Sequence, residues 1–326
     1  MSKTITVTGS QGFIGSYLCL ELLNHGWEVL GIDNFSKYGK VSRPHDSHPS
    51  FTLVEHDLSQ SFPKVAKTDY MVAGAAMIGG ISYFHKYAYD LISHNERIIA
   101  NTFDQAVHDK MRRVVVLSSS MVYESTRTFP TREELATHIP PPLSTYGFQK
   151  LSTEYFAKGA WEQYKLPYTI IRPFNCVGVG EEKSIKEEAI TSGNIELMMS
   201  HVLPDLVNKV MKGQEPLHIL GSGKQVRCYT NGKDIARGIR IALESNAAIN
   251  EDFNISVSTP TTVLELANMV WDRLNPEKPF SYVCDTPYKY DVAYRVPDVS
   301  KAYKLLGFKA RISLEESIDE VIEYMV

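Results

Sequence analysis

The stretch Thr8-Gly9-Ser10-Gln11-Gly12-Phe13-Ile14-Gly15 decides the fold of this chain. A β-branched run at residues 4–7 precedes it and predicts a buried strand. Ile14, Leu18 and Leu22 follow at a spacing that places them on one face of a helix. A strand, a glycine-rich turn and a helix in this order form the context in which spaced glycines hold a dinucleotide.

Each glycine of the turn has its own expected role. Gly9 permits the tight turn, Gly12 lets the backbone approach a pyrophosphate, and Gly15 lets the helix pack on the strand. The helix N-terminus offers N–H groups to that anion. Because the spacing is G-x-x-G-x-x-G, the glycines alone are a weak signal, and an ordinary glycine-rich turn is the alternative. The flanking strand and helix favour the dinucleotide.

Asp33 ends the second predicted strand, at residues 28–33. A carboxylate there accepts hydrogen bonds from both adenosine ribose hydroxyls and repels a 2′-phosphate. No Lys or Arg follows at once, because Asn34 and Phe35 come next and Lys37 lies further on. We therefore expect NAD rather than NADP, with a solvated turn aspartate as the alternative.

Composition excludes several classes of protein. The chain has 326 residues, 43% of them hydrophobic, and a net charge of −4, so no broad basic surface for nucleic acid or an anionic membrane is expected. The four cysteines are far apart and are expected to be free thiols. No signal peptide or membrane-spanning run is visible, so we expect a cytoplasmic protein.

Short apolar runs alternate with helical stretches over the first 120 residues. This alternation predicts an α/β fold with a doubly wound parallel sheet and right-handed crossovers. The predicted strands are residues 4–8, 28–33, 51–55, 69–73 and 113–119. Residues 34–50 between them read as an exposed polar loop near the cofactor, and a metal site at His45 and His48 is the less favoured reading.

Polar or small residues follow several of these strands. Asp57 is expected to face the adenine amino group and Leu58 to cover the ring, while the small residues 73–76 leave room for a ligand at the switch point of the sheet. Ser118, Ser119 and Ser120 follow the fifth strand and would offer hydroxyls to a ligand.

A helix beginning near Ser144 carries Tyr146 and Lys150. Their i, i+4 spacing puts both side chains on one face. An ammonium near a phenol lowers the phenol pKa, so the pair could remove a proton from a hydroxyl as hydride leaves the same carbon. Such a pair also occurs by chance on helix surfaces, and its order after the glycine turn and the serines makes the prediction specific.

The chain after residue 178 has no dinucleotide signature of its own. We predict an NAD-binding domain at residues 1–178 and a smaller C-terminal α/β lobe for substrate at 179–326, with segments at about 225–260 returning to the larger domain. Residues 181–195 read as a charged insertion. Capping boxes at Thr262-x-x-Glu265 and Ser313-x-x-Glu316 predict two helix starts.

The whole pattern resembles the extended short-chain dehydrogenase/reductase family, in its nucleotide-sugar epimerase/dehydratase group. The resemblance rests on the glycine turn, Ser118-Ser119-x-x-Val122-Tyr123, Tyr146-x-x-x-Lys150, Arg172-x-x-Asn175-x-x-Gly178 and the tail from Arg295-x-Pro297-Asp298 to Gly307. It implies a Rossmann-type fold, bound NAD, and an isomerase that acts on a nucleotide sugar, with a UDP-sugar favoured.

The resemblance also implies residue roles. Tyr146 would be the general base, Lys150 would hold the nicotinamide ribose and lower the Tyr146 pKa, and Ser119 would bond the sugar oxygen. Arg227 and Arg295 would clamp the diphosphate, with surface ion pairs as the alternative. The other expected cofactor contacts are Gly9, Gly12, Phe13, Ile14, Gly15, Asp33, Asn34, Asp57, Leu58, Ala73, Ala75, Asn95, Ser118 and Pro173, and the other expected substrate contacts are Met77, Ser120, Met121 and Asn175.

Two departures from the family pattern bear on the reaction. Related dehydratases carry Asp-Glu where this chain has Ser120 and Met121. At the position of Met121, related decarboxylases carry Glu, and related epimerase-reductases and 3,5-epimerases carry Cys. A thioether moves no proton. Simple oxidation and re-reduction at one carbon remains, which is 4-epimerisation through a 4-keto sugar.

Two alternatives stay open. A dehydratase or multi-carbon epimerase could recruit an acid or base from elsewhere, such as Glu124, Tyr83 or a cysteine, and a non-catalytic member could only sense the dinucleotide. The resemblance further implies a homodimer, formed by helices near residues 86–109 and 146–165. The sequence does not identify the sugar or the nucleotide base.

Overall fold

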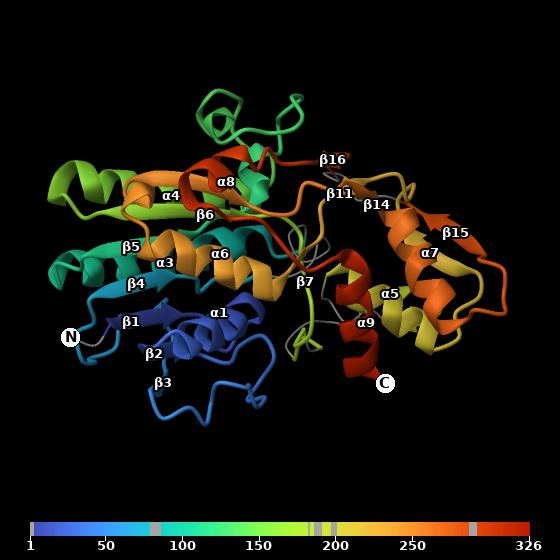
Figure 1. The fold of residues 1–326 in the computed structure, drawn as a ribbon, viewed down its shortest axis with the longest axis horizontal. Helices are drawn as coiled ribbons and strands as arrows, with labels where there is room; N and C mark the ends of the chain where they lie inside the picture. The colour runs from blue at the N-terminus through green and yellow to red at the C-terminus, as the bar shows by residue number, and fades with distance from the viewer. Residues whose placement is uncertain (1–2, 79–85, 182, 186–190, 197–200, 287–291) are drawn as a thin grey trace.

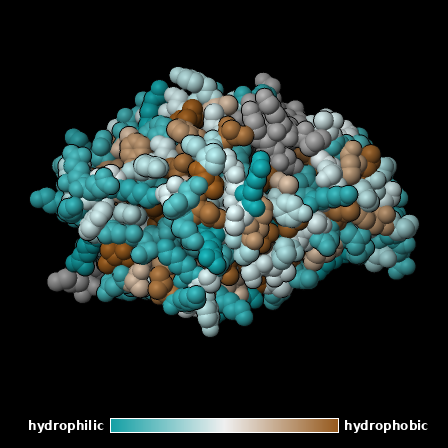
Figure 2. All heavy atoms as spheres, turned by 90° about the horizontal axis from the view of Figure 1, so that it is seen from above, coloured by the Kyte–Doolittle hydropathy of each residue, from teal (hydrophilic) through white to brown (hydrophobic). Residues whose placement is uncertain are grey.

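The computed structural model describes residues 3–78, 86–181, 183–185, 191–196, 201–286 and 292–326. Figure 1 shows a larger part built on one sheet, with a smaller part beside it that contains α5, α7 and α9. On the face drawn in Figure 2, hydrophilic residues predominate and the hydrophobic residues form small separate groups.

The larger part is built on seven strands, and every strand pairs in parallel with its neighbours. Their order across the sheet is β13-β6-β5-β4-β1-β2-β3. The strands are β1 Lys3–Thr8, β2 Trp27–Asp33, β3 Phe51–Glu55, β4 Tyr70–Ala73, β5 Arg113–Leu117, β6 Tyr168–Pro173 and β13 Glu251–Ile255. The doubly wound parallel sheet expected from the sequence is confirmed.

Helices cover both faces of this sheet (Figure 1). A hydrophobic core lies on each face of the sheet, because successive side chains of a strand point to opposite faces. In β5, Val115 packs in one core and Val114 and Val116 pack in the other. The helices on the first side are α1 Phe13–Asn24 and α6 Gly232–Glu244, and those on the second are α3 Ala88–His108 and α4 Thr145–Tyr164. The sheet is therefore buried on both faces, as its β-branched strands require.

The direction in which successive strands are added reverses between β1 and β4. The carboxyl ends of these two strands therefore lie at the topological switch point, where open α/β sheets bind ligands. The glycine turn follows β1, and the small residues 74–76 follow β4. A cavity of about 790 Å³ opens at this edge.

The smaller part has its own core around Trp271 and Leu266. Both predicted capping boxes are confirmed, because Thr262 and Ser313 each accept an N–H from the glutamate three residues on and that glutamate bonds back. Its elements are α5 Val202–Met211, α7 Val263–Leu274, α9 Leu314–Met325, the parallel pair β10 Leu217–Leu220 and β15 Tyr282–Asp285, and the small sheet of β14 Thr261–Thr262, β11 Val226–Arg227 and β16 Tyr294–Arg295.

The chain passes between the two parts more than once. β7 Cys176–Val177 leads out of the large sheet and pairs with β12 Thr230–Asn231. α6 and β13 then return to the large sheet, where β13 pairs with β6. We keep the division at residues 178 and 179 as a proposal, with α6 and β13 lying in the larger part. The remaining elements are β8 Thr191–Ser192, β9 Ile195–Glu196, α8 Ser300–Leu306 and the short helices η1 Ser120–Tyr123, η2 Glu133–Thr137 and η3 Asn246–Ala248.

Candidate active site

The glycine turn leaves no room for side chains. Gly9 has φ of +75°, and a Cβ there would lie 2.9 Å from the Ala75 Cα. A Cβ on Gly15 would lie 1.9 Å from the Gly9 carbonyl oxygen. Gly12 is the N-cap of α1 and offers no side-chain cap, so the first N–H groups of that helix face the cavity edge. The turn fits a pyrophosphate.

Asp33 at the end of β2 lines the same cavity. Its Oδ2 accepts the Gln11 N–H at 3.0 Å and its Oδ1 accepts the Phe35 N–H at 2.8 Å. Burial raises the pKa of the Asp33 carboxyl, and the two backbone N–H groups oppose that rise. Each oxygen keeps a further lone pair, so the carboxylate fits the adenosine ribose hydroxyls.

Ser119, Tyr146 and Lys150 come together at the other end of the cavity. Ser119 caps η1 and bonds the Tyr146 phenol. Tyr146 and Lys150 are buried one turn apart on α4, and Lys150 Nζ donates to the Leu117 carbonyl oxygen at 3.0 Å. The N-cap Ser144 and the i, i+4 spacing account for this placement.

The pKa of Tyr146 differs from the value near neutral that the sequence predicts. Burial raises the pKa of Tyr146, and the Ser119 hydroxyl and the charge of Arg295 only oppose that rise. Burial lowers the pKa of Lys150 to about 8. The expected lowering of the Tyr146 pKa toward neutral is therefore absent in this structure, since the phenol is desolvated and the Lys150 ammonium points to a backbone carbonyl.

One cavity joins these two regions, with a pyrophosphate cradle at one end and a hydroxyl–phenol–ammonium group at the other. The family model described as "NAD dependent epimerase/dehydratase family" matches residues 5–256. The chain belongs to this family. The resemblance inferred from the sequence is confirmed, and the family's dependence on NAD agrees with the cofactor expected from Asp33.

Individual relatives of this epimerase/dehydratase carry different activities. UDP-glucuronic acid decarboxylase 1 of Danio rerio is 25% identical over 99% of this chain and 72% of its own length. A putative UDP-glucose 4-epimerase of Methanocaldococcus jannaschii is 27% identical over 98% of each chain. The solved UDP-glucose 4-epimerase of Thermotoga maritima with UDP-glucose is 26% identical, covers 99% of this chain and 98% of its own, and superposes with a TM-score of 0.81.

Most of the residues predicted for the site line this cavity. All three predicted catalytic residues do, and so do all the predicted cofactor residues except Ala73 and Asn95. The predicted substrate residues, all of which lie in the described part of the chain, line the cavity as well, except Arg227. Their roles in binding stay predictions.

Asn95 and Arg227 lie just behind the lining. The Asn95 side chain accepts the Met77 N–H at 2.6 Å and donates to the Met77 carbonyl at 3.0 Å, so it holds a lining residue in place. Arg227 is buried in β11, in register with Arg295 of β16, and its Nη1 donates to the Val226 carbonyl at 2.9 Å. Ala73 is a buried residue of β4.

The wall beside Tyr146 is apolar. Met121 is buried against Tyr146 and Leu91, and Met77 and Val292 pack on the same cluster. The position at which a decarboxylase or dehydratase would need a carboxylate thus holds a thioether in an apolar contact.

Glu124, one of the alternative acids and bases considered from the sequence, is engaged at the start of α4. Glu124 Oε2 accepts both the N–H and the hydroxyl of Ser144 at 2.9 Å, so it braces the start of α4 and is not among the described residues that line the cavity. Tyr83 lies outside the described residues.

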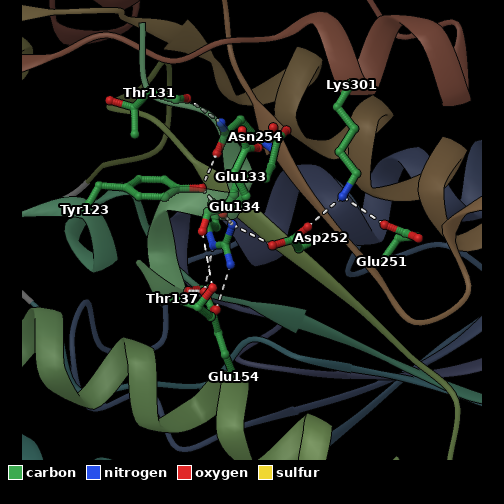
Figure 3. Close-up of polar contacts among 12 residues, drawn as sticks. Tyr123, Thr131, Glu133, Glu134, Thr137, Glu154, Glu251, Asp252, Asn254 and Lys301 are labelled. Carbon is green, nitrogen blue, oxygen red and sulfur yellow. Dashed lines mark hydrogen bonds and ion pairs between the residues drawn. The ribbon is translucent and has the colours of Figure 1, made fainter. Parts of the chain in front are cut away.

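An ionic network surrounds the buried side chain of Arg172, and Figure 3 labels its partners Glu154 and Asp252. Arg172 of β6 binds both oxygens of Glu154 at 2.8 Å and reaches Asp252 of β13 at 2.8 Å. Ser118 donates to Glu154 Oε1 at 2.6 Å, so this pair ties the end of β5 to α4. Lys301 of α8 completes the network by contacting Asp252 and Glu251. The network fixes the end of β5, which leads into Ser119, against the helix that carries Tyr146.

The structure also shows residues that the sequence analysis missed. His201 lines the cavity with its Nδ1 on the buried carboxylate of Glu181, and its ring lies 6.2 Å from that of Phe13. Cys176 lines the same region, and burial raises the pKa of its thiol. No spacing rule joins residues 181 and 201 to the glycine turn, so their approach is visible only in the fold.

The loop at residues 34–50 differs from its expected exposed character. His45 is fully buried, and burial lowers the pKa of its imidazole to about 4. Its Nε2 lies 3.3 Å from the Gln11 side-chain amide, inside the glycine turn. The loop therefore braces the turn, because its polar residues find partners beneath the surface.

Three further features concern the residues that the structure describes. No group of three or more His, Cys, Asp or Glu side chains suited to a metal ion is found there. None of the helices there has the length and apolar character that crossing a bilayer requires. All four cysteines are free thiols, and Cys284 alone among them is exposed.

Proposed function

We propose that the protein is an NAD-dependent nucleotide-sugar 4-epimerase, with a UDP-sugar as substrate. The observation that carries the proposal is Met121, which packs on Tyr146 at the position where related decarboxylases carry a carboxylate. The group beside it consists of Ser119, Tyr146 and Lys150, which suffices for proton transfer at one sugar oxygen.

The named relatives support the substrate class. The Methanocaldococcus and Thermotoga proteins are named as UDP-glucose epimerases, and the Danio protein acts on UDP-glucuronic acid. All three names share a UDP-sugar. Arg295 and Asn175 line the cavity and offer donors of the kind that a nucleotide diphosphate requires.

The mechanism follows from the atoms of three side chains. Tyr146 Oη takes the proton of the sugar 4-hydroxyl, and the Ser119 hydroxyl holds the same oxygen. Lys150 supplies positive charge one turn along α4. The glycine turn, Asp33 and Lys150 would hold NAD, which would supply reversible hydride acceptance at C4. Tyr146 then returns the proton, so no cofactor is consumed over a cycle.

The experiment is a reaction in deuterated buffer with a panel of UDP-hexoses, UDP-hexuronates and UDP-N-acetylhexosamines, followed by NMR of the sugar protons. A C4 epimer without deuterium on carbon is the expected product. A product that carries carbon-bound deuterium, or one that has lost water or carbon dioxide, would overturn 4-epimerisation in favour of a dehydratase, a decarboxylase or a multi-carbon epimerase. No turnover of any UDP-sugar would overturn the UDP assignment.

Tyr146→Phe serves as the matched control, because it removes one oxygen and keeps the ring in its apolar contact. Turnover is expected to fall by about 10²- to 10⁴-fold, the usual contribution of a general base. Near wild-type turnover would remove Tyr146 from the mechanism.

We also propose a homodimer formed through α3 and α4. These helices lie side by side, and Tyr89, Phe148 and Tyr155 are exposed on them. Two such pairs would bury these rings in a four-helix bundle. Light scattering should give twice the chain mass, and Tyr155→Lys should shift the mass toward one chain.

A further inference from the structure

The loop between β2 and β3 reaches across to the chain that follows β7. Its Arg43 is almost fully buried, with Nε donating to the Gln11 carbonyl at 3.2 Å and Nη1 donating to the Gly180 carbonyl at 2.9 Å. One guanidinium therefore joins the glycine turn to the first residues beyond the larger part. A Cβ at Gly180 would lie 3.0 Å from Nη1, so this approach depends on a glycine there.

A second contact joins the same two segments. The Ile185 N–H donates to the Lys37 carbonyl at 3.0 Å. The Ile185 side chain packs over Gly39, where a Cβ would lie 3.6 Å from its Cδ1. The two contacts come from different positions in the loop, so the connection does not depend on one side chain.

These contacts lie at the adenosine end of the cavity. Ser36, Lys37, Gly39 and Ser184 line the cavity together with Asp33, whereas Arg43 and Gly180 lie outside its lining and hold these segments together. The rim here is a closed connection between two segments that are far apart in sequence. A nucleotide under this rim would leave only after the connection opens.

Arg43 also fixes the turn that would hold the pyrophosphate. Gln11 is held through its N–H by Asp33, through its carbonyl by Arg43, and through its side-chain amide by Asp46 at 3.0 Å. The Arg43 N–H donates to Asp46 Oδ2 at 2.7 Å, so the loop is itself held in shape. Its Nη2 is buried without a hydrogen-bond partner among the described residues. A guanidinium in this setting exerts its charge on Asp33 as well.

We infer that Arg43 is a positioning residue that retains NAD, because it clasps the glycine turn and Gly180 together over the adenosine half of the cofactor. The clasp makes release of NAD slow relative to turnover. This fits a reaction that regenerates its cofactor, but the inference depends only on NAD binding and not on the sugar chemistry.

The test measures how fast NAD leaves. NAD-loaded protein, freed of unbound nucleotide by gel filtration, is mixed with excess NADH, and the gain of protein-bound NADH fluorescence is followed without any sugar nucleotide. Arg43→Met is expected to release NAD about 10- to 100-fold faster, since two hydrogen bonds from a charged group are lost. Arg43→Lys keeps the charge but cannot donate in the two directions of a guanidinium. Its rate of NAD release should lie between those of the wild type and Arg43→Met.

Lys40→Met is the matched control. Lys40 belongs to the same loop but is exposed and pairs with Glu55, so NAD release should stay within twofold of the wild type. Ile185→Pro is a second variant, which removes both the N–H that Lys37 accepts and the side chain that packs over Gly39, and it should also speed release. It covers the case in which Arg43→Met does not fold.

The outcomes separate this inference from the proposed function. NAD release at the wild-type rate in folded Arg43→Met and in Ile185→Pro would overturn the clasp. A wild-type protein that releases NAD as fast as turnover proceeds would overturn it as well. Faster release together with turnover restored by added NAD would support it. A wild-type protein that retains NAD but epimerises no UDP-sugar would overturn the proposed function and leave the clasp standing.

Discussion

Arg227 and Arg295 lie opposite each other in register on the parallel strands β11 and β16, yet Arg295 lines the cavity and Arg227 lies behind it. Arg295 also acts on the phenol of Tyr146, whose pKa its charge lowers against the larger effect of burial. The two arginines should therefore have separable effects on turnover and on binding.

Arg295→Met is expected to raise the KM for the UDP-sugar about 10- to 100-fold, because a charged donor is lost. It should also move the midpoint of the pH–activity profile to higher pH, since the Tyr146 pKa rises when the positive charge is removed. Arg227→Lys should raise KM without moving that midpoint. Equal shifts of the profile in both variants would contradict the assignment.

Lys150→Met should stabilise the NAD-free protein while abolishing turnover. The pKa of Lys150 is lowered from 10.5 to about 8, so between these values the unfolded chain binds more protons than the folded one. The cost of burying the ammonium is therefore full below pH 8 and fades as pH rises toward 10.5. We expect a gain of about 1–3 kcal/mol in the free energy of unfolding near pH 7, measured by urea titration. A loss of stability at pH 7 would contradict it.

His45 should make the protein sensitive to mild acid. Its pKa is lowered from 6.5 to about 4, so it contributes stability that is present above 6.5 and is lost as pH falls toward 4. His45→Gln should flatten the dependence of the free energy of unfolding on pH in this window, by about 1–3 kcal/mol over its width. The comparison is a set of urea titrations from pH 4 to 7. His48→Gln, elsewhere in the loop, should keep the wild-type slope.

Glu154→Ala should destabilise the protein by about 3–5 kcal/mol, because it leaves the Arg172 guanidinium buried with half of its partners. The double variant Glu154→Leu with Arg172→Leu should recover much of that loss. The exposed pair Lys40 and Glu55 is the control, where removal of one partner should cost less than about 1 kcal/mol. Calorimetric unfolding of these three variants would decide, and equal losses in the buried and exposed pairs would contradict the argument.

The elements that sequence could predict are those specified by local pattern. β1, the glycine turn and α1 follow from hydrophobic period and glycine spacing, and Tyr146 and Lys150 follow from helical spacing after a cap. Each of these depends on residues within one turn or one strand. The switch point then follows, because strand order in a doubly wound sheet obeys general rules.

The parts that could not be predicted depend on loops that meet only in three dimensions. Arg43 and His45 lie in a segment without periodicity, and they are buried because Gln11, Asp46 and Gly180 supply partners. The pKa of Tyr146 differs from the expectation for a related reason. The spacing on α4 placed Lys150 beside the phenol, but burial and the distant Arg295 determine the charge around it.

The return of β13 to the edge of the large sheet has a consequence for protein engineering. A fragment ending near residue 178 would carry the whole glycine turn and the Tyr146 helix, yet β6 would become an uncovered edge and Arg172 would lose Asp252. Such a fragment would tend to aggregate through that edge. Exchange of the smaller part between homologues therefore needs at least two junctions, placed on either side of α6 and β13, and a single-crossover chimera should fail to fold.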